Sequence, residues 1–261
     1  MEQEDQDFAA FIRKVKQHSA IDLAQYKEAQ MKRRLTTLYS KRGFASFTAF
    51  FDGMMKDREL YYEFLDRMTI NVSEFWRNPN RWEVLEAKFL PELARESSRI
   101  KCWSAACSTG EEPYTLAMIL AENGWLTQAS ILATDLDEGA LEKAQQGVYM
   151  DRSVRDVPDK YIRKYFTHQD HLMRISDSLK RSVQYRKQNL LHDPFDVSFD
   201  LIICRNVMIY FTEEAKHQLY LKFSRALKPG GILFVGSTEQ IFTPGQYDLE
   251  PAETFFYRRK R

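Results

Sequence analysis

The chain has 261 residues, 44% of them hydrophobic, and a formal net charge of +1 at pH 7, which suits a globular protein with one large domain or two smaller ones. No run of about 18 uncharged apolar residues occurs, and the acidic opening MEQEDQDFAAF lacks the basic and apolar parts of a signal peptide, so we expect a cytosolic protein without membrane insertion. The three cysteines show no ligand spacing, which predicts reduced thiols and no metal site.

Residues 1–70 are expected to form a helical domain. From residue 7 to about residue 69 there is no proline and only Gly43 and Gly53, and the apolar residues recur at helical spacing. The segment YKEAQMKRRLTTLYSKR carries six basic residues and one acidic residue. Its helix would pack through Met31 and Leu35 and present a charged flank, which indicates an acidic partner.

Residues 71–98 are expected to connect this domain to the next. Asn78 and Pro79 interrupt the segment TINVSEFWRNPNRWEVLEAKFLPEL before a second amphipathic helix begins. From residue 99 onward, short apolar strands such as ASILATDL and FDLIICRNV alternate with helices, which predicts a mostly parallel, doubly wound α/β sheet over residues 99–261. Residues 166–188 alternate like short strands and are expected to form a small inserted sheet.

The loop after the first of these strands, AACSTGEEP, indicates the class of ligand. A dinucleotide-binding loop needs several glycines so that backbone amides can reach a pyrophosphate, and only Gly110 is in register here. Glu111 and Glu112 would repel a phosphate at close range, whereas they suit S-adenosyl-L-methionine, which has two cationic centres and no phosphate. The alternative is that both acids only stabilise the N-terminus of the following helix.

Two further strand ends place polar residues where ligands bind in open α/β sheets. Asp135 ends the strand ILATD and is positioned to accept hydrogen bonds from ribose hydroxyls; the alternative role, capping the next helix, suits Asp137 better. Arg205 and Asn206 follow the apolar run FDLIIC, although an arginine in such a loop can also pair at the surface.

Several stretches together resemble the CheR-type chemotaxis methyltransferases. They are TINVSEFWRN, WSAACSTGEEPYTLA, ATDLDEGALEKAQQGVY and FDLIICRNVMIYF, followed by LKPGGILFVGSTE. The resemblance implies a Rossmann-like S-adenosylmethionine-dependent methyltransferase domain with a small inserted antiparallel sheet, preceded by an all-helical N-terminal domain. It also implies methyl transfer from S-adenosyl-L-methionine to glutamate side chains of chemoreceptors, the methyl-accepting chemotaxis proteins, with S-adenosyl-L-homocysteine as the product.

The same resemblance implies which residues form the site. The cofactor-binding positions that it carries over are Asn71, Ser73, Arg77, Glu112, Asp135, Asn189, Leu190, Arg205 and Asn206. Arg77, Arg205 and Tyr210 are expected to orient the acceptor carboxylate beside the transferred methyl group. A glutamate with a pKa of roughly 4.3 is ionised at neutral pH, so the reaction needs no general base.

A protein partner is also implied by the resemblance. Lys27, Lys32, Arg33 and Arg34 are expected to recognise the glutamate-rich methylation helices of chemoreceptors. Relatives that bind a receptor's C-terminal pentapeptide carry a glycine-rich loop in the inserted sheet. This chain has no glycine from residue 148 to residue 229, so a pentapeptide tether is not expected. We expect a monomer.

Two other functions are compatible with the same cofactor. An RNA methyltransferase would use the basic helix to bind phosphates, but CRNVMIYF lacks the N/D-P-P-Y/F motif that holds a flipped base, so no nucleic-acid partner is expected. A non-catalytic module that senses the cofactor would have no need of Arg205, Asn206 and Tyr210.

Overall fold

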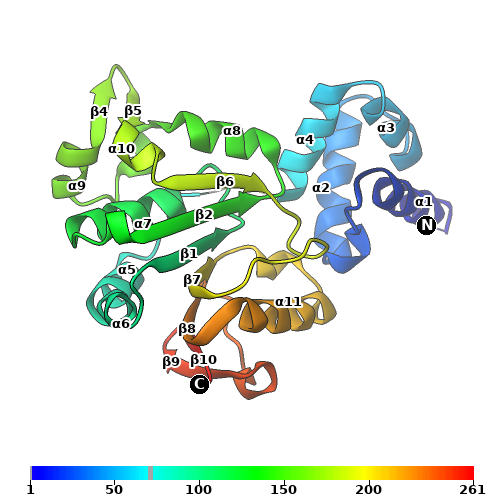
Figure 1. The fold of residues 1–261 in the computed structure, drawn as a ribbon. Helices are drawn as coiled ribbons and strands as arrows, with labels where there is room; N and C mark the ends of the chain where they lie inside the picture. Colours follow the sequence, from blue (N-terminus) through cyan, green and yellow to red (C-terminus); the bar gives the residue numbers. More distant parts are fainter. Residues whose placement is uncertain (1, 70–72) are drawn as a thin grey trace.

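In the computed structural model, which describes residues 2–69 and 73–261, a bundle of helices lies beside an α/β domain (Figure 1). The bundle consists of α1 (Glu2–Ser19), η1 (Leu23–Gln25), α2 (Glu28–Lys41), α3 (Phe47–Met54) and α4 (Arg58–Thr69). Its core is aromatic: Phe8 and Phe11 of α1 pack on Phe47 and Phe50 of α3, and Phe64 of α4 completes the cluster. The expected helical N-terminal domain is confirmed.

The segment after the bundle forms a helical stretch with a π-helical middle. Its parts are α5 (Pro79–Val84), η2 (Leu85–Phe89) and α6 (Leu90–Glu96). Pro91 has no backbone N–H to donate one turn back, which accounts for the wider turn before it. Trp82 and Phe89 are buried, with their rings 5.7 Å from Phe234 and 4.8 Å from Phe256. The stretch therefore packs directly on the main sheet.

Within the described residues, the main sheet has seven strands in the order β6-β2-β1-β7-β8-β10-β9. They are β1 (Ile100–Ala105), β2 (Ala129–Asp135), β6 (Val183–Lys187), β7 (Phe199–Cys204), β8 (Leu227–Val235), β9 (Leu249–Glu253) and β10 (Phe256–Arg259). The first five in that order are parallel, and β10 and β9 add an antiparallel edge. This confirms the predicted, mostly parallel sheet.

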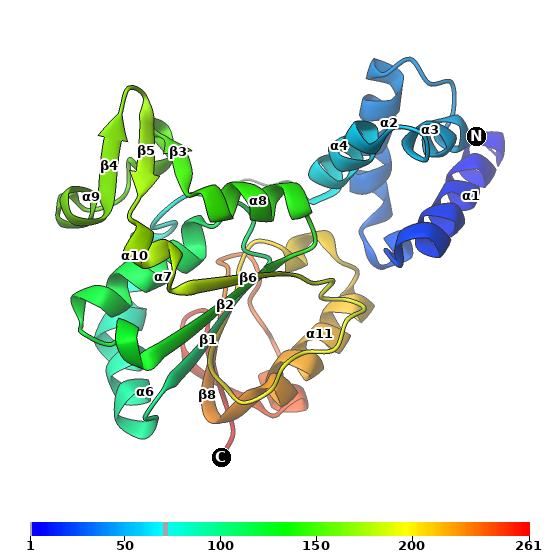
Figure 2. The same ribbon diagram turned by 45° about the horizontal axis from the view of Figure 1, so that its top comes forward.

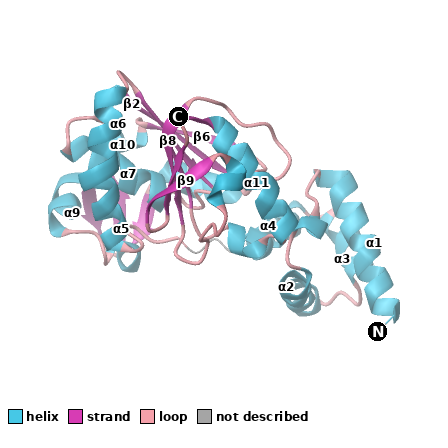
Figure 3. Cartoon of the chain, turned by 90° about the horizontal axis from the view of Figure 1, so that it is seen from below, coloured by secondary structure: helices cyan, strands magenta, loops and turns pink. Residues whose placement is uncertain are grey.

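Helices cover both faces of the sheet (Figure 3). Among them are α7 (Glu111–Glu122), α8 (Glu138–Gln146) and α11 (Glu213–Ala226), whereas α9 (Asp159–Tyr165) and α10 (Asp177–Lys180) lie in the chain between α8 and β6. Alternation along β1 turns Cys102 toward the core that contains α7 and Trp103 toward the core that contains α11. The parallel strands run toward the helical bundle, so their carboxyl ends face it (Figure 2).

A small antiparallel sheet is inserted between α8 and β6. In the part of the chain that the structure describes, it has three strands in the order β3-β5-β4, namely β3 (Val148–Met150), β4 (Phe166–Gln169) and β5 (Leu172–Ile175). It therefore begins before the expected residues 166–188 and ends earlier, because β6 pairs with β2 in the main sheet. Val183 and Tyr185 alternate with polar residues, a pattern that predicts a strand but not the sheet that it joins.

In residues 2–69 and 73–261, no helix combines the length and the apolar character that crossing a membrane requires. The same residues contain no group of three or more histidine, cysteine, aspartate or glutamate side chains that could hold a metal ion. All three cysteines are buried free thiols.

Candidate active site

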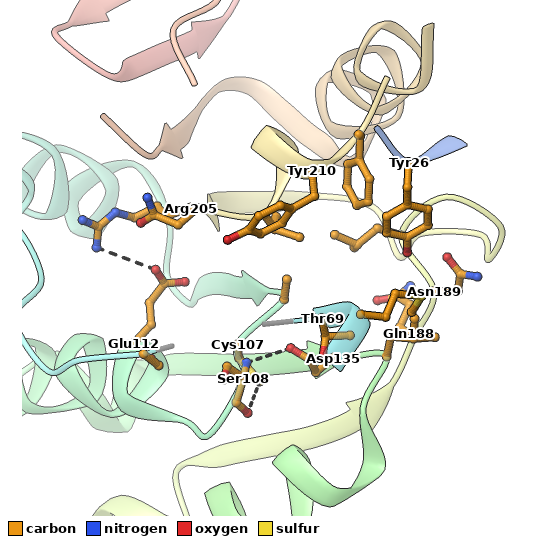
Figure 4. Close-up of a pocket in the computed structure, with 18 of the residues that line it drawn as sticks. Tyr26, Thr69, Cys107, Ser108, Glu112, Asp135, Gln188, Asn189, Arg205 and Tyr210 are labelled. Atoms are coloured by element: carbon orange, nitrogen blue, oxygen red, sulfur yellow. Dashed lines mark hydrogen bonds and ion pairs between the residues drawn. The ribbon is translucent and has the colours of Figure 1, made fainter. Parts of the chain in front are cut away.

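A cleft lies where the carboxyl ends of the parallel strands meet the helical bundle, with an empty volume of about 940 Å³ that is partly open to solvent. Every predicted cofactor or catalytic residue that the structure describes lines this cleft: Ser73, Arg77, Glu112, Asp135, Asn189, Leu190, Arg205, Asn206 and Tyr210. Figure 4 shows Glu112, Asp135, Asn189, Arg205 and Tyr210 around it. Asn71 lies outside the described residues. The fold thus gathers side chains from the connector and from the ends of several strands into one site.

The loop after β1 separates its two neighbouring glutamates. Gly110 has a φ of +92°, and an added Cβ would lie 2.8 Å from the Cβ of Ala144, so glycine is needed where the loop enters α7. The carboxylate of Glu111 accepts hydrogen bonds from the hydroxyl of Thr109. Glu112, in contrast, lines the cleft. One of the two acids is therefore available to a ligand in the cleft, and the other serves the loop.

Glu112 marks one end of the cleft (Figure 4). Its carboxylate accepts a hydrogen bond from the hydroxyl of Ser104 at 2.8 Å, and its Oε2 lies 3.7 Å from Nη1 of Arg205. Burial raises the pKa of Glu112 to about 7, although the Arg205 guanidinium opposes the shift. An ammonium group bound here would favour the ionised carboxylate, so this end of the cleft suits a cation.

The sequence left two roles open for Asp135, which are binding a ribose and capping the next helix, and the structure assigns the cap to Asp137. Asp137 caps α8, because its side chain accepts hydrogen bonds from the N–H groups of Gly139 and Ala140. Asp135 lines the cleft, where its two oxygens accept hydrogen bonds from the N–H groups of Ser108 (2.7 Å) and Asp137 (3.0 Å). Burial raises the pKa of Asp135 to about 6 against these hydrogen bonds. Its remaining lone pairs suit hydroxyl donors such as a ribose diol.

Arg205 is a buried link between three parts of the site. Only 4% of its side chain is exposed, which excludes the alternative of a surface ion pair. Its Nη2 donates hydrogen bonds to the carbonyl of Arg77 (2.6 Å) and to Oδ1 of Asn78 (2.8 Å). The guanidinium also lies 4.7 Å from the centre of the Phe234 ring. Arg205 therefore holds the connector against β7 beside Glu112.

Glu239 anchors the loop after β7, and sequence reasoning gave it no role. This buried carboxylate accepts hydrogen bonds from the N–H groups of Asn206 (2.7 Å), Met208 (2.7 Å) and Gly236 (2.8 Å). Burial raises its pKa, and the backbone hydrogen bonds oppose that shift. The segment that leads to Tyr210 is thus fixed at two of its amides. The only sequence signal was an acid soon after the strand, in VGSTE.

The helical bundle also contributes to the cleft, which sequence reasoning missed. Tyr26, Met68 and Thr69 line it. The bundle is joined to the loop after β7 by two backbone hydrogen bonds, from Lys27 N–H to the Tyr210 carbonyl (2.8 Å) and from Thr212 N–H to the Gln25 carbonyl (2.9 Å). No local pattern could have predicted this contact, because a helical period does not say which face of a neighbouring domain the helix meets.

The four basic residues predicted to recognise a partner do not share one surface. Lys32 points toward α1, where it pairs with Asp5 at 2.6 Å and lies over the ring of Phe8. Arg34 instead stacks on Tyr210. The remaining two, Lys27 and Arg33, are exposed. These side chains point toward different neighbours, and their recognition of a receptor stays a prediction.

A mostly parallel α/β sheet with Glu112 and Asp135 in the cleft at its strand ends fits the class of S-adenosylmethionine-dependent methyltransferases, which the family comparison shows. Residues 71–256 match the family described as CheR methyltransferase, SAM binding domain, and residues 6–69 match its all-alpha domain. The chain belongs to the CheR methyltransferase family.

Named relatives agree along most of the chain. A protein named chemotaxis protein methyltransferase from Listeria monocytogenes is 42% identical and covers 97% of each chain. One of the same name from Borreliella burgdorferi is 35% identical over 90% of this chain and 88% of that one. Among solved structures, StiE O-MT is similar with a TM-score of 0.38 and 14% identity, covering 59% of this chain and 41% of that one.

Proposed function

We propose that the protein is a protein-glutamate O-methyltransferase that transfers a methyl group from S-adenosyl-L-methionine to glutamate side chains of chemoreceptors. The observation that carries this proposal is the charge pattern of the cleft. Glu112 and Asp135 form an acidic cofactor side, and Arg77 and Arg205 supply cationic groups next to it. No histidine is found among the described residues that line the cleft. A carboxylate acceptor fits such a site, because it arrives ionised and needs no base.

S-adenosyl-L-methionine supplies an electrophilic methyl group and leaves as the neutral thioether S-adenosyl-L-homocysteine. In this proposal Glu112 binds the ammonium group at one end, and Asp135 accepts hydrogen bonds from the ribose hydroxyls. Asn189 and Leu190 contact the adenine. The carboxylates of Glu112 and Asp135 are opposite in charge to the cofactor's cationic centres, so the residues present fit the group.

Arg77 and Tyr210 would orient the acceptor carboxylate in line with the methyl group. Arg205 would hold Arg77 in place through its hydrogen bond to the Arg77 carbonyl. The carboxylate oxygen forms the new bond to carbon as the bond between carbon and sulfur breaks. No proton is transferred, so the contribution of the protein is to position the groups and to exclude water.

The acceptor is proposed to be a receptor helix rich in glutamate. Exposed Lys27 precedes the basic helix α2 as its N-cap residue and exposed Arg33 lies on the helix, while Arg34 of the same helix contacts Tyr210 of the cleft. This arrangement supports docking of an acidic helix along α2. The names of the relatives, which refer to chemotaxis, support the same partner. We propose that the protein acts in the cytosol as a monomer, without a pentapeptide tether.

The experiment that tests this function is methyl transfer from labelled cofactor to membranes that contain a chemoreceptor. We expect the label to enter the receptor and to be released as methanol by mild base, as a carboxyl methyl ester requires. The matched control is a receptor whose methylation-helix glutamates are replaced by alanine, which should stay unlabelled. Label that resists base, or that enters added RNA and not the receptor, would refute the proposal.

A further inference from the structure

Tyr26 lies where the helical bundle meets the loop after β7. The backbone on both sides of it is tied to that loop by the hydrogen bonds of Lys27 and Gln25 described above. Its ring meets Phe211 edge to face, with centroids 5.1 Å apart and an interplanar angle of 77°. Its place beside the strand ends is thus fixed by two backbone hydrogen bonds and one aromatic contact.

The side chain of Tyr26 reaches into the cleft at the end opposite Glu112. Figure 4 shows its hydroxyl pointing toward Asn189 and Gln188, with Asp135 nearby. Within residues 2–69 and 73–261, the hydroxyl makes no hydrogen bond, and it is not among the fully buried polar atoms. Burial and the charge of Asp135 raise the pKa of Tyr26, so the phenol stays neutral and able to donate at neutral pH.

The order of residues along the cleft decides what would lie next to this hydroxyl. The acid suited to an ammonium group is Glu112, and the acid suited to a ribose is Asp135, which is closer to Tyr26 (Figure 4). A cofactor bound in this direction places its methionine part at Glu112 and its adenosine part between Asp135 and Tyr26. Adenosine offers ring nitrogens and ribose oxygens that accept a hydrogen bond.

We propose that Tyr26 is a cofactor-binding residue supplied by the helical bundle: its ring closes the adenosine end of the cleft, and its hydroxyl donates a hydrogen bond to the adenosine. Tyr26 also lines a smaller hollow with Lys27, Arg34 and Tyr210, so it separates the cofactor from the basic helix. The bundle is then part of the cofactor site and not only a surface for a protein partner.

The test compares S-adenosyl-L-homocysteine with adenosine, which lacks the ammonium group, by calorimetric titration of the full chain. Tyr26→Phe should lower the affinity for both ligands by about three- to tenfold, as expected for one lost hydrogen bond. Tyr26→Ala should weaken both by more than about tenfold, because the ring contact is lost as well. Glu112→Gln should weaken S-adenosyl-L-homocysteine much more than adenosine, which shows that the two ligands report on the two ends of the cleft.

Tyr39→Phe is the matched control, because Tyr39 lies on α2 with its ring 4.8 Å from Phe47 in the bundle core. It should leave both affinities unchanged. Tyr26→Phe keeps the ring and so the contact with Phe211. If this variant binds both ligands within twofold of the unchanged protein, or loses S-adenosyl-L-homocysteine but not adenosine, the inference is overturned. Receptor methylation is not needed for this measurement, so failure of the proposed acceptor would leave it unaffected.

Discussion

The guanidinium carbon of Arg34 lies 5.0 Å from the centre of the Tyr210 ring. This contact joins a cation of the basic helix α2 to an aromatic side chain that lines the cleft. Burial lowers the pKa of Arg34, and the neighbouring Tyr210 opposes that shift. The hydroxyl of Tyr210 points into the cleft on the side of Arg205 (Figure 4). Arg34 is therefore placed to hold the Tyr210 ring, which gives it a different position from the exposed Arg33.

Substitution of Arg34 should affect turnover more than binding. A cation stacked on an aromatic ring contributes about 0.5–2 kcal/mol, so Arg34→Ala should lower kcat for receptor methylation by about three- to tenfold. Arg34→Lys should recover part of this loss, because it keeps the charge but not the planar group. Arg33→Ala is the matched control and should raise KM for the receptor at nearly constant kcat. If Arg34→Ala, like Arg33→Ala, raised KM and left kcat unchanged, Arg34 would be a receptor contact and not a support for Tyr210.

Asp135 and Asp137 provide a second matched pair. Asp135→Asn should weaken binding of S-adenosyl-L-homocysteine by at least about tenfold, because a charged acceptor for the ribose hydroxyls is lost. Asp137→Ala should instead lower the free energy of unfolding by about 1 kcal/mol through loss of the α8 cap and leave the affinity nearly unchanged. Calorimetry and chemical denaturation of both variants distinguish the roles. Normal affinity of Asp135→Asn would show that Asp135 only orders its loop.

Sequence reasoning succeeded where strand, loop and helix are consecutive in the chain. The positions of Glu112 after one strand and of Asp135 after the next, and the cap that Asp137 forms on α8, follow from local spacing, and parallel pairing brings the strand ends together. Arg205 was placed at the cleft by the same rule. Its bonds to the connector were not predicted, because they depend on how a distant segment crosses the sheet.

The features that the sequence did not predict share a physical cause, which is packing between segments far apart in the sequence. Tyr26 reaches the cleft only because the bundle docks on the loop after β7. Lys32 and Arg34 are two residues apart on one helix and so point to different neighbours, α1 and Tyr210. The alternation along β6 suits the edge strand that it is, but only its long-range pairing with β2 decides which sheet it joins.

The raised pKa of Glu112 predicts that cofactor binding depends on pH. Burial holds the pKa of this carboxyl at about 7 in the ligand-free protein, so below that pH it is mostly protonated. A bound ammonium group favours the ionised form, and binding at lower pH must therefore release a proton. Affinity for S-adenosyl-L-homocysteine should rise with pH between about 5.5 and 7.5, by at most about tenfold per unit for this one group.

Titration calorimetry across that range measures the pH effect, and Glu112→Gln is its control. The variant should bind more weakly and with a shallower dependence on pH. The dependence that remains would come from Asp135, whose pKa burial raises to about 6. An unchanged slope in Glu112→Gln would show that Glu112 does not contact the ammonium group.

Glu239 should prove necessary for turnover although it does not line the cleft. Its two oxygens serve three backbone N–H groups, two of them in the segment that carries Asn206 and leads to Tyr210. Glu239→Gln replaces one oxygen by an amide donor, which leaves at least one of these N–H groups without an acceptor. We expect the free energy of unfolding to fall by about 1–3 kcal/mol.

The effect of Glu239→Gln on kcat shows whether Glu239 positions the loop that carries Tyr210 or only stabilises the fold. A loosened loop displaces Tyr210 from the acceptor, so kcat should fall by about tenfold or more while S-adenosyl-L-homocysteine affinity changes less. Glu250→Gln, at an exposed position of β9, is the control and should behave like the unchanged protein. If Glu239→Gln is destabilised but retains full kcat below its unfolding temperature, then the three hydrogen bonds stabilise the fold without positioning Tyr210.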